Sequence, residues 1–80
     1  MAKYKITAYL INKDVNNHES DEKSIKDYEY ILGLGDHSFK ERVDRLKEYP
    51  IDGDVFEFDN INSNVFIGED GDGVYLYEKI

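Results

Sequence analysis

Alternating apolar and polar residues predict a β-strand at residues 3–11, with one face formed by Tyr4, Ile6, Ala8 and Leu10. The opposite face also carries apolar groups, Tyr9 and Ile11 among them, so we expect this strand to be central in its sheet. Residues 12–23 are polar and predict a flexible loop.

Residues 27–34 fit two patterns. Tyr28 and Tyr30 stand two apart, as on one face of a strand, and Gly33 and Gly35 interrupt the chain shortly after them. These features favour a strand over 27–34. A helix over residues 21–32 is the rival interpretation, and the sequence leaves it open.

The next segment predicts a helix that begins with a capping box. The Ser38 hydroxyl can accept the Glu41 N–H while the Glu41 side chain reaches back. Helical spacing then gives one apolar stripe, made of Phe39, Val43, Leu46 and Tyr49. Pro50 ends the helix, because the residue before a proline avoids the helical region.

Three more strands are predicted after Pro50. Residues 54–59 form the first, with Phe56 and Phe58 on one face. Residues 64–69 and 72–79 form a hairpin around Asp70-Gly71, a strong hairpin signal. That turn sets a register in which Ile67 faces Val74, Val65 faces Leu76, Phe66 faces Tyr75, Asn64 faces Tyr77 and Glu69 faces Asp72.

The order of elements is therefore ββαβββ, an α+β fold with one helix packed on an antiparallel sheet. We expect a single domain over residues 1–80. The sequence has no cysteine and no apolar run long enough to cross a membrane, so we expect a cytoplasmic protein that needs no disulfide.

Charge is distributed very unevenly along the chain. Residues 1–50 carry nine Lys/Arg and ten Asp/Glu, whereas residues 51–80 carry eight acids and the single base Lys79. The formal net charge of −8 thus comes almost entirely from the C-terminal part. The negative electrostatic field of these acids disfavours direct binding to nucleic acid or anionic membranes. It also attracts basic partners toward the protein.

We therefore expect a partner-binding surface made of acids with aromatic anchors. The Glu69–Asp72 pairing would place like charges across the hairpin, at a cost that stability alone does not explain. Glu57 and Asp59 would stand about 6.6 Å apart on one strand, near the spacing of successive phosphates. The candidate residues are Asp52, Asp54, Glu57, Asp59, Glu69, Asp70, Asp72, Phe66, Tyr75 and Tyr77. A solvated polar face, with the aromatics packed under the helix, is the alternative interpretation.

Catalysis and metal binding have little support. His18 and His37 lack sequence partners that would suggest a nucleophile or metal site. The acids are abundant, but we expect them to be exposed, whereas acid–base catalysis needs a carboxyl group whose pKa is shifted by burial. Asp70-Gly71-Asp72-Gly73 opens like a calcium loop, but Val74 occupies a ligand position. Gly33-Leu34-Gly35 lacks the Lys of a phosphate-binding loop. We expect no enzymatic activity, no metal and no cofactor.

The first half of the chain carries a further pattern. Tyr4 to Leu10 leads through an acidic loop to Tyr28-Glu29-Tyr30, then Gly33-Leu34 and an amphipathic helix. This pattern resembles the uracil-DNA glycosylase inhibitors of bacteriophages, which imitate DNA, and it departs from them after Pro50. In size and charge the chain is also similar to anti-CRISPR and anti-restriction proteins, and to immunity proteins that neutralise nuclease toxins.

The leading hypothesis is thus a non-enzymatic phage or mobile-element protein in the bacterial cytoplasm. It would inhibit a basic nucleic-acid-binding protein by imitating DNA. An immunity or antitoxin protein facing a basic toxin is the first alternative. A small structural or assembly module, with a possible homodimer through an exposed edge strand, is the second.

Overall fold

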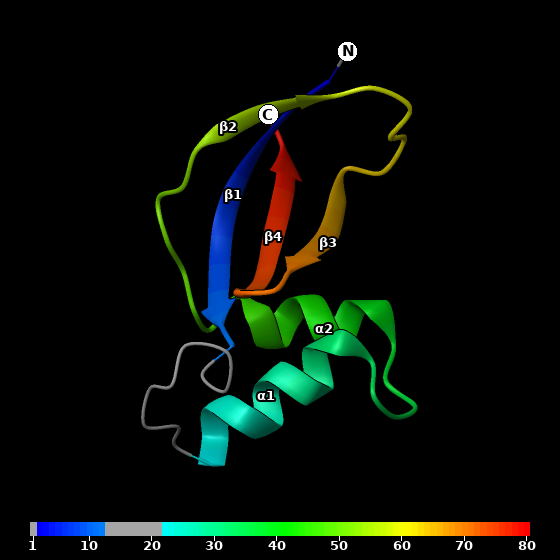
Figure 1. The fold of residues 1–80 in the computed structure, drawn as a ribbon. Helices are drawn as coiled ribbons and strands as arrows, with labels where there is room; N and C mark the ends of the chain where they lie inside the picture. Colours follow the sequence, from blue (N-terminus) through cyan, green and yellow to red (C-terminus); the bar gives the residue numbers. More distant parts are fainter. Residues whose placement is uncertain (1, 13–21) are drawn as a thin grey trace.

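The structure is a computed structural model that describes residues 2–12 and 22–80. Its elements are β1 (Ala2–Ile11), α1 (Glu22–Leu32), α2 (Phe39–Leu46), β2 (Val55–Phe58), β3 (Val65–Asp70) and β4 (Gly73–Lys79). The strands form one antiparallel sheet in the order β2-β1-β4-β3, with both helices at one end of the sheet (Figure 1). The α+β class is confirmed, but the sheet carries two helices instead of one.

The predicted strand over residues 27–34 is wrong, because most of these residues belong to helix α1. Gly33 has φ +79°, and its N–H donates to the Tyr30 carbonyl while the Leu34 N–H donates to the Glu29 carbonyl. These two bonds form a Schellman motif, in which a left-handed glycine closes a helix. Gly33 is therefore a helix-ending signal and not a break in a strand. Most of the predicted loop over residues 12–23 lies outside the described residues, and its end, Glu22 and Lys23, opens α1.

Helix α2 begins as predicted. Ser38 is its N-cap, and its hydroxyl accepts the Glu41 N–H at 3.1 Å and donates to the Glu41 carboxylate at 3.1 Å. Val43 and Leu46 are buried, but Phe39 is 45% exposed, so the predicted stripe loses its first member. Neither helix of the described part is long and apolar enough to span a membrane.

Strand β1 is central, as predicted, and it changes faces in its middle. Ile6 pairs with Tyr77 and Ala8 pairs with Leu76, so Thr7 is an extra residue that makes a β-bulge. Because cross-strand partners share a face, Ile6 and Ala8 point to opposite sides of the sheet. The four residues predicted for one face are all buried, but Tyr4 and Ile6 lie on one side and Ala8 and Leu10 on the other.

The side toward the helices holds an aliphatic core. Its buried members come from both layers, with Val74 and Leu76 on the sheet and Ile31 and Leu46 on the helices. This core matches the predicted aliphatic side of the hairpin, because Val65 and Ile67 pack against it.

The other side of the sheet carries an aromatic face, which we define as Tyr4, Tyr9, Phe56, Phe58, Phe66, Tyr75 and Tyr77. The rings of Phe58 and Phe66 lie 5.3 Å apart although they belong to opposite edge strands. On a flat sheet their backbones would be about 14 Å apart, so the sheet curls toward this side. β2 accordingly arches over one end of the sheet (Figure 1).

Tyr4 lies at the centre of this curl and is 0% exposed. Its ring meets Phe58 and Phe66 edge-on, and its hydroxyl donates to the Ser63 carbonyl in the segment that follows β2. The aromatic face is therefore a second, smaller core at this end.

The hairpin exists as predicted, but its register is shifted by two residues. Phe66 pairs with Tyr77, Ile67 with Leu76 and Glu69 with Val74, while Asp70 faces Gly73. The turn residues are Gly71 and Asp72. A shift of two keeps every side chain on its predicted face, but it removes the predicted Glu69–Asp72 pairing.

Replacing Tyr4 should separate the ring's contribution from that of the hydroxyl. Tyr4→Ala should lower the free energy of unfolding by roughly 3–5 kcal/mol, as for other buried aromatics. Tyr4→Phe, which keeps the ring and loses the hydroxyl with its bonds to the Ser63 and Ile61 carbonyls, should cost about 1 kcal/mol. Urea unfolding followed by circular dichroism measures both. Equal losses for the two variants would contradict a packed ring at this position.

Candidate partner-binding surface

The hairpin tip is organised by the Asp70 side chain. One carboxylate oxygen accepts the backbone N–H groups of Asp72 at 2.8 Å and Gly73 at 3.1 Å, and the other accepts the Tyr75 hydroxyl at 2.8 Å. Asp at the first and Gly at the fourth position suit an ordinary tight turn, and neither Gly71 nor Asp72 has a positive φ. These bonds explain why the turn begins at Asp70 and why the predicted register was wrong.

The same bonds set the acidity of the tip. Hydrogen bonds from the Tyr75 hydroxyl and from the Asp72 and Gly73 N–H groups lower the pKa of Asp70. In return, the bond to Asp70, followed by burial, raises the pKa of Tyr75. Burial, followed by the charges of Asp70 and Asp72, raises the pKa of Tyr9. The tip is therefore anionic, and its tyrosines are neutral, at physiological pH.

Two tyrosines connect this acidic tip to the aromatic face. Tyr9 and Tyr75 stack with centroids 4.7 Å apart, and the Tyr9 hydroxyl donates to the Asp72 carbonyl. Tyr77 stacks on Phe66 at 4.6 Å with nearly parallel planes. Phe66, Tyr75 and Tyr77 are half-buried, and they lie on the side away from the helices. The alternative interpretation that they pack under a helix is therefore wrong.

The remaining candidate acids lie around β2. Asp52 forms an ion pair with Lys5, whose hydrogen bond and charge lower the pKa of Asp52. Asp54 and Asp59 flank β2, and Glu57 lies within it, directly across from Lys3. All seven candidate acids are exposed. Within residues 2–12 and 22–80, Asp52 is the only one of the seven that forms an ion pair.

The acids form two groups and not one patch. Glu57 sits opposite Lys3 at one end of β1, whereas the hairpin tip sits opposite Ile11 at the other. That interval along β1 corresponds to about 25 Å. The structure thus brings Glu69, Asp70 and Asp72 together with Tyr75. It places Glu57 and Asp59 toward the far end of β1. Asp52 and Asp54 lie beside the middle of β1, where Asp52 pairs with Lys5 and the Asp54 carbonyl accepts the Ile6 N–H.

Two members of this surface were missed in the sequence. Neither residue is among the candidates predicted for partner binding. The sequence pattern places Tyr9 on the second face of its strand, and it places Phe56 on one face of another strand. In the structure Phe56 is 43% exposed. The period-two spacing of Tyr75 and Tyr77 indicates that both rings lie on one face of their strand. The sequence does not predict the β-bulge that brings Tyr9 onto the same side.

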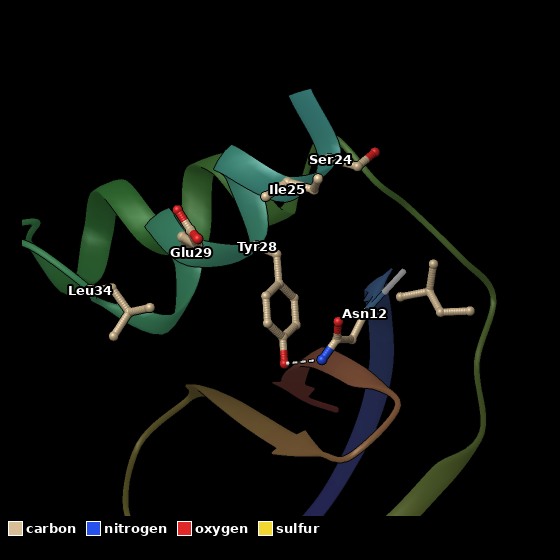
Figure 2. A pocket seen from close by; sticks show the side chains of 7 residues that line it. Asn12, Ser24, Ile25, Tyr28, Glu29 and Leu34 are labelled. Atoms are coloured by element: carbon tan, nitrogen blue, oxygen red, sulfur yellow. Dashed lines mark hydrogen bonds between the residues drawn. The ribbon is translucent and has the colours of Figure 1, made fainter. Parts of the chain in front are cut away.

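A cavity of about 160 Å³ lies beside α1, between its residues Ser24, Ile25, Tyr28 and Glu29 and the end of β1 (Figure 2). The Asn12 amide donates to the Tyr28 hydroxyl at 3.3 Å across its floor. Burial, followed by the charge of Glu69, raises the pKa of that hydroxyl. The cavity therefore offers the Asn12 and Tyr28 hydrogen-bonding groups together with the Glu29 carboxyl group.

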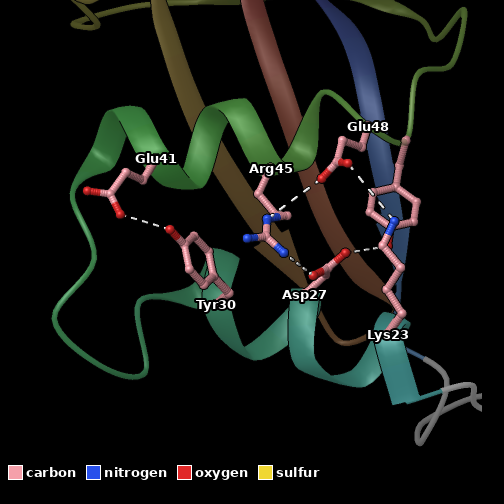
Figure 3. A network of polar contacts seen from close by, with 7 residues as sticks. Lys23, Asp27, Tyr30, Glu41, Arg45 and Glu48 are labelled. Atoms are coloured by element: carbon pink, nitrogen blue, oxygen red, sulfur yellow. Dashed lines mark hydrogen bonds and ion pairs between the residues drawn. The ribbon is translucent and has the colours of Figure 1, made fainter.

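A polar network joins the two helices (Figure 3). Asp27 on α1 is 2% exposed, and it accepts a bond from the Arg45 guanidinium at 2.8 Å and one from the Tyr49 hydroxyl at 2.6 Å. Arg45 also stacks over the Tyr30 ring, whose hydroxyl donates to Glu41 at 2.8 Å. Every carboxylate oxygen of Asp27 thus has a donor, so this network is a structural connection between the helices.

The histidines and the calcium-like loop offer no clear chemistry. His37 stacks on Tyr30 at 3.7 Å near the start of α2, and His18 lies outside the described residues. The part of the chain that is described contains no group of three or more side chains suited to hold a metal.

Comparison with known proteins gives no relative: no family model matches the chain, and neither a curated protein nor a solved structure is found to be similar. The surface must therefore be interpreted from its own geometry.

Replacing Asp70 should test the turn and its pH dependence. Asp70→Asn should destabilise the protein at neutral pH, because it removes a charged acceptor from the turn. A lowered folded-state pKa stabilises the protein above the ordinary Asp pKa of 3.8, and this stabilisation is lost as pH falls through the folded-state value. The difference from wild type should therefore shrink on acidification below pH 3.8, as urea unfolding across pH would show. A difference that stays constant would refute the proposed role.

Replacing Asp27 should test the network between the helices. Asp27→Asn should lower the free energy of unfolding by about 1–3 kcal/mol, because it removes the buried anionic partner of the Arg45 guanidinium and leaves only the exposed Glu48. Glu48→Gln is the matched control, since the Glu48 side chain is 52% exposed, and it should change stability by less than about 0.5 kcal/mol. Equal effects would show that burial of Asp27 contributes nothing.

Proposed function

We propose that this protein is a non-enzymatic inhibitor of the phage or mobile-element type. It binds a basic nucleic-acid-binding protein of a bacterial host and occupies the surface that nucleic acid would use. The observation that carries this proposal is the set of exposed C-terminal acids, of which only Asp52 is neutralised by an ion pair among the described residues.

The distribution of cations supports this interpretation. Three cations in or next to the helices are engaged elsewhere: Arg45 binds Asp27, Lys23 approaches Glu48, and Lys47 approaches Glu78 at 3.7 Å. No ion pair joins any cation of either helix to the seven candidate acids within the described ranges. Their field therefore reaches solvent, where it accelerates association with a basic surface.

The hairpin tip is the better candidate of the two acidic groups. Its acids lie beside stacked tyrosines, and Asp70 is held in place by three hydrogen bonds. Rigid aromatic rings bind guanidinium and ammonium groups through their faces, and adjacent carboxylates add charge-assisted hydrogen bonds. Lys and Arg side chains that normally hold phosphates would find both features here.

The two-group arrangement changes how the imitation of DNA would work. A single continuous row of acids is not present, so the protein would not copy one strand. The hairpin tip and Glu57, about 25 Å apart along β1, could instead contact both borders of a basic groove. An immunity or antitoxin protein would use the same surface against a basic toxin, and the identity of the partner separates the two.

Charge reversal at the tip should weaken partner binding. We expect Glu69→Lys with Asp72→Lys to weaken partner binding by about tenfold to hundredfold, and more at low salt than at high salt. Asp70 is kept, because its carboxylate holds the turn. The immobilised protein is exposed to nuclease-treated bacterial lysate, and retained proteins are identified by mass spectrometry. Duplex DNA added in solution should release them.

The matched control is Asp36→Lys with Asp44→Lys, which changes net charge equally at exposed positions near α2. It should retain the same proteins as the wild type. A pair at β2, Asp54→Lys with Glu57→Lys, reports whether the second acidic group takes part. Identical capture by tip and control variants, or retention unaffected by DNA, contradicts the proposal. A nuclease toxin as the retained protein favours the immunity alternative.

A further inference from the structure

Strand β3 is an edge strand with one open side. It pairs with β4, and no other strand of residues 2–12 and 22–80 pairs with it. The Lys79 N–H donates to the Asn64 carbonyl, so the even-numbered positions of β3 bond to β4. In an antiparallel pair these bonds alternate. The N–H and C=O groups of Val65, Ile67 and Glu69 therefore point away from the sheet.

This open side lacks the features that usually protect an edge. β3 contains no lysine, no proline and no bulge, and its acids stand only at the end near the turn. Natural sheets normally block such edges, because an unpaired row of backbone groups is a template for another strand.

A groove of about 290 Å³ runs along this side, between β3 and the helices. Ile31 and Leu32 of α1 and Phe39 of α2 form its apolar wall, and Ile67 forms part of the facing wall. Phe39 is 45% exposed although it begins an apolar helical stripe. The groove thus lies where alternate side chains of an added strand would point.

Arg42 gives this groove a charged end. Its Nε is buried and has no hydrogen-bond partner, and its Nη1 makes only a long bond of 3.4 Å to the Ile31 carbonyl. The guanidinium also lies 5.8 Å from the Phe39 ring centroid. A buried donor without an acceptor is unusual in folded proteins, and a carboxylate is among the strongest acceptors for a guanidinium.

We propose that the β3 edge binds an extended segment of another protein by strand addition. The segment bonds to the outward backbone groups of Ile67 and Glu69. One of its apolar side chains enters the groove beside Phe39, and a carboxylate two residues away on the same face binds Arg42. A second copy of this chain fits less well, because each copy carries a net charge of −8. The proposal goes beyond the acidic surface and does not depend on it.

The amides of the free protein provide the first test. Hydrogen exchange followed by NMR should show fast exchange at Val65, Ile67 and Glu69 and slow exchange at Phe66, Gly68 and Asp70. Protection of the first set in the free protein would mean that the edge is already covered, and would overturn the proposal. Protection that rises with protein concentration would identify a second copy as the occupant, and would also overturn it.

A peptide provides the second test. The probe is a short capped peptide of alternating threonine and valine in which one valine is replaced by glutamate. Its addition should slow exchange at Val65, Ile67 and Glu69. It should bind at least about tenfold more tightly than the peptide with glutamine at that position. Arg42→Gln should remove this preference, and persistence of the preference would overturn the assignment of Arg42.

Variants of Glu69 separate the backbone from the charge. Glu69→Pro removes an outward N–H that β4 does not use, so the hairpin should remain while peptide affinity falls at least about tenfold. Glu69→Gln keeps that N–H and removes the acid, and its affinity should stay within about twofold of wild type. Equal peptide affinities for the two variants would refute strand addition at β3. NMR chemical-shift changes on the aromatic face when the peptide is added would refute it as well.

Discussion

The β-bulge at Thr7 is the constraint on which the rest of the structure depends. It lets the central strand give Tyr4 and Ile6 to one side of the sheet and Ala8 and Leu10 to the other. One strand thereby supplies two cores, which a chain of 80 residues without cysteine needs in order to bury enough apolar surface. The backbone of residues 49–54 follows the outer side of β1 here, and Ile51 N–H donates to the Thr7 carbonyl. Gly53 permits this approach, since a Cβ there would lie 2.7 Å from the Cβ of Ile6.

Much of the fold could be predicted from the sequence, and the errors have local causes. The N-cap at Ser38, the strand around Phe56 and the existence of the hairpin follow from short-range rules, and they are confirmed. The rival helix over residues 21–32 matches α1 and is confirmed, whereas the favoured strand is wrong. The strand was favoured because Gly33 was interpreted as a break in a strand, when a glycine after a helix commonly adopts positive φ. The hairpin register depends on the Asp70 side chain, which competes for backbone donors in a way that residue type alone does not reveal. The bulge has no signature in the apolar pattern, because burial alternates through it without interruption.

The candidate surface was predictable as a list of residues but not as a shape. Exposure of the seven acids follows from their polar surroundings, whereas their division into two groups follows from strand order. β2 and the hairpin tip are close in sequence, yet they lie at opposite ends of β1. The aromatic residues required the same information, because Tyr9 meets Tyr75 only through the register of β1 with β4. Charge density along a sequence is therefore a weak guide to charge density on a surface when strands reverse direction.

Pairing between distant segments also constrains how the protein can acquire its structure. β1 is the earliest strand of the chain, but its neighbours β2 and β4 come much later, and Tyr4 pairs with Lys79. β1 is therefore synthesised before either of its partner strands, whereas α1 and α2, which meet through Asp27 and Arg45, follow each other closely in the sequence. Nonlocal topologies of this kind fold more slowly than local ones and leave apolar strands open to aggregation in the interval. The helix pair is thus the part of the fold whose contacts are local, and the sheet is the part that needs both ends of the sequence to be present.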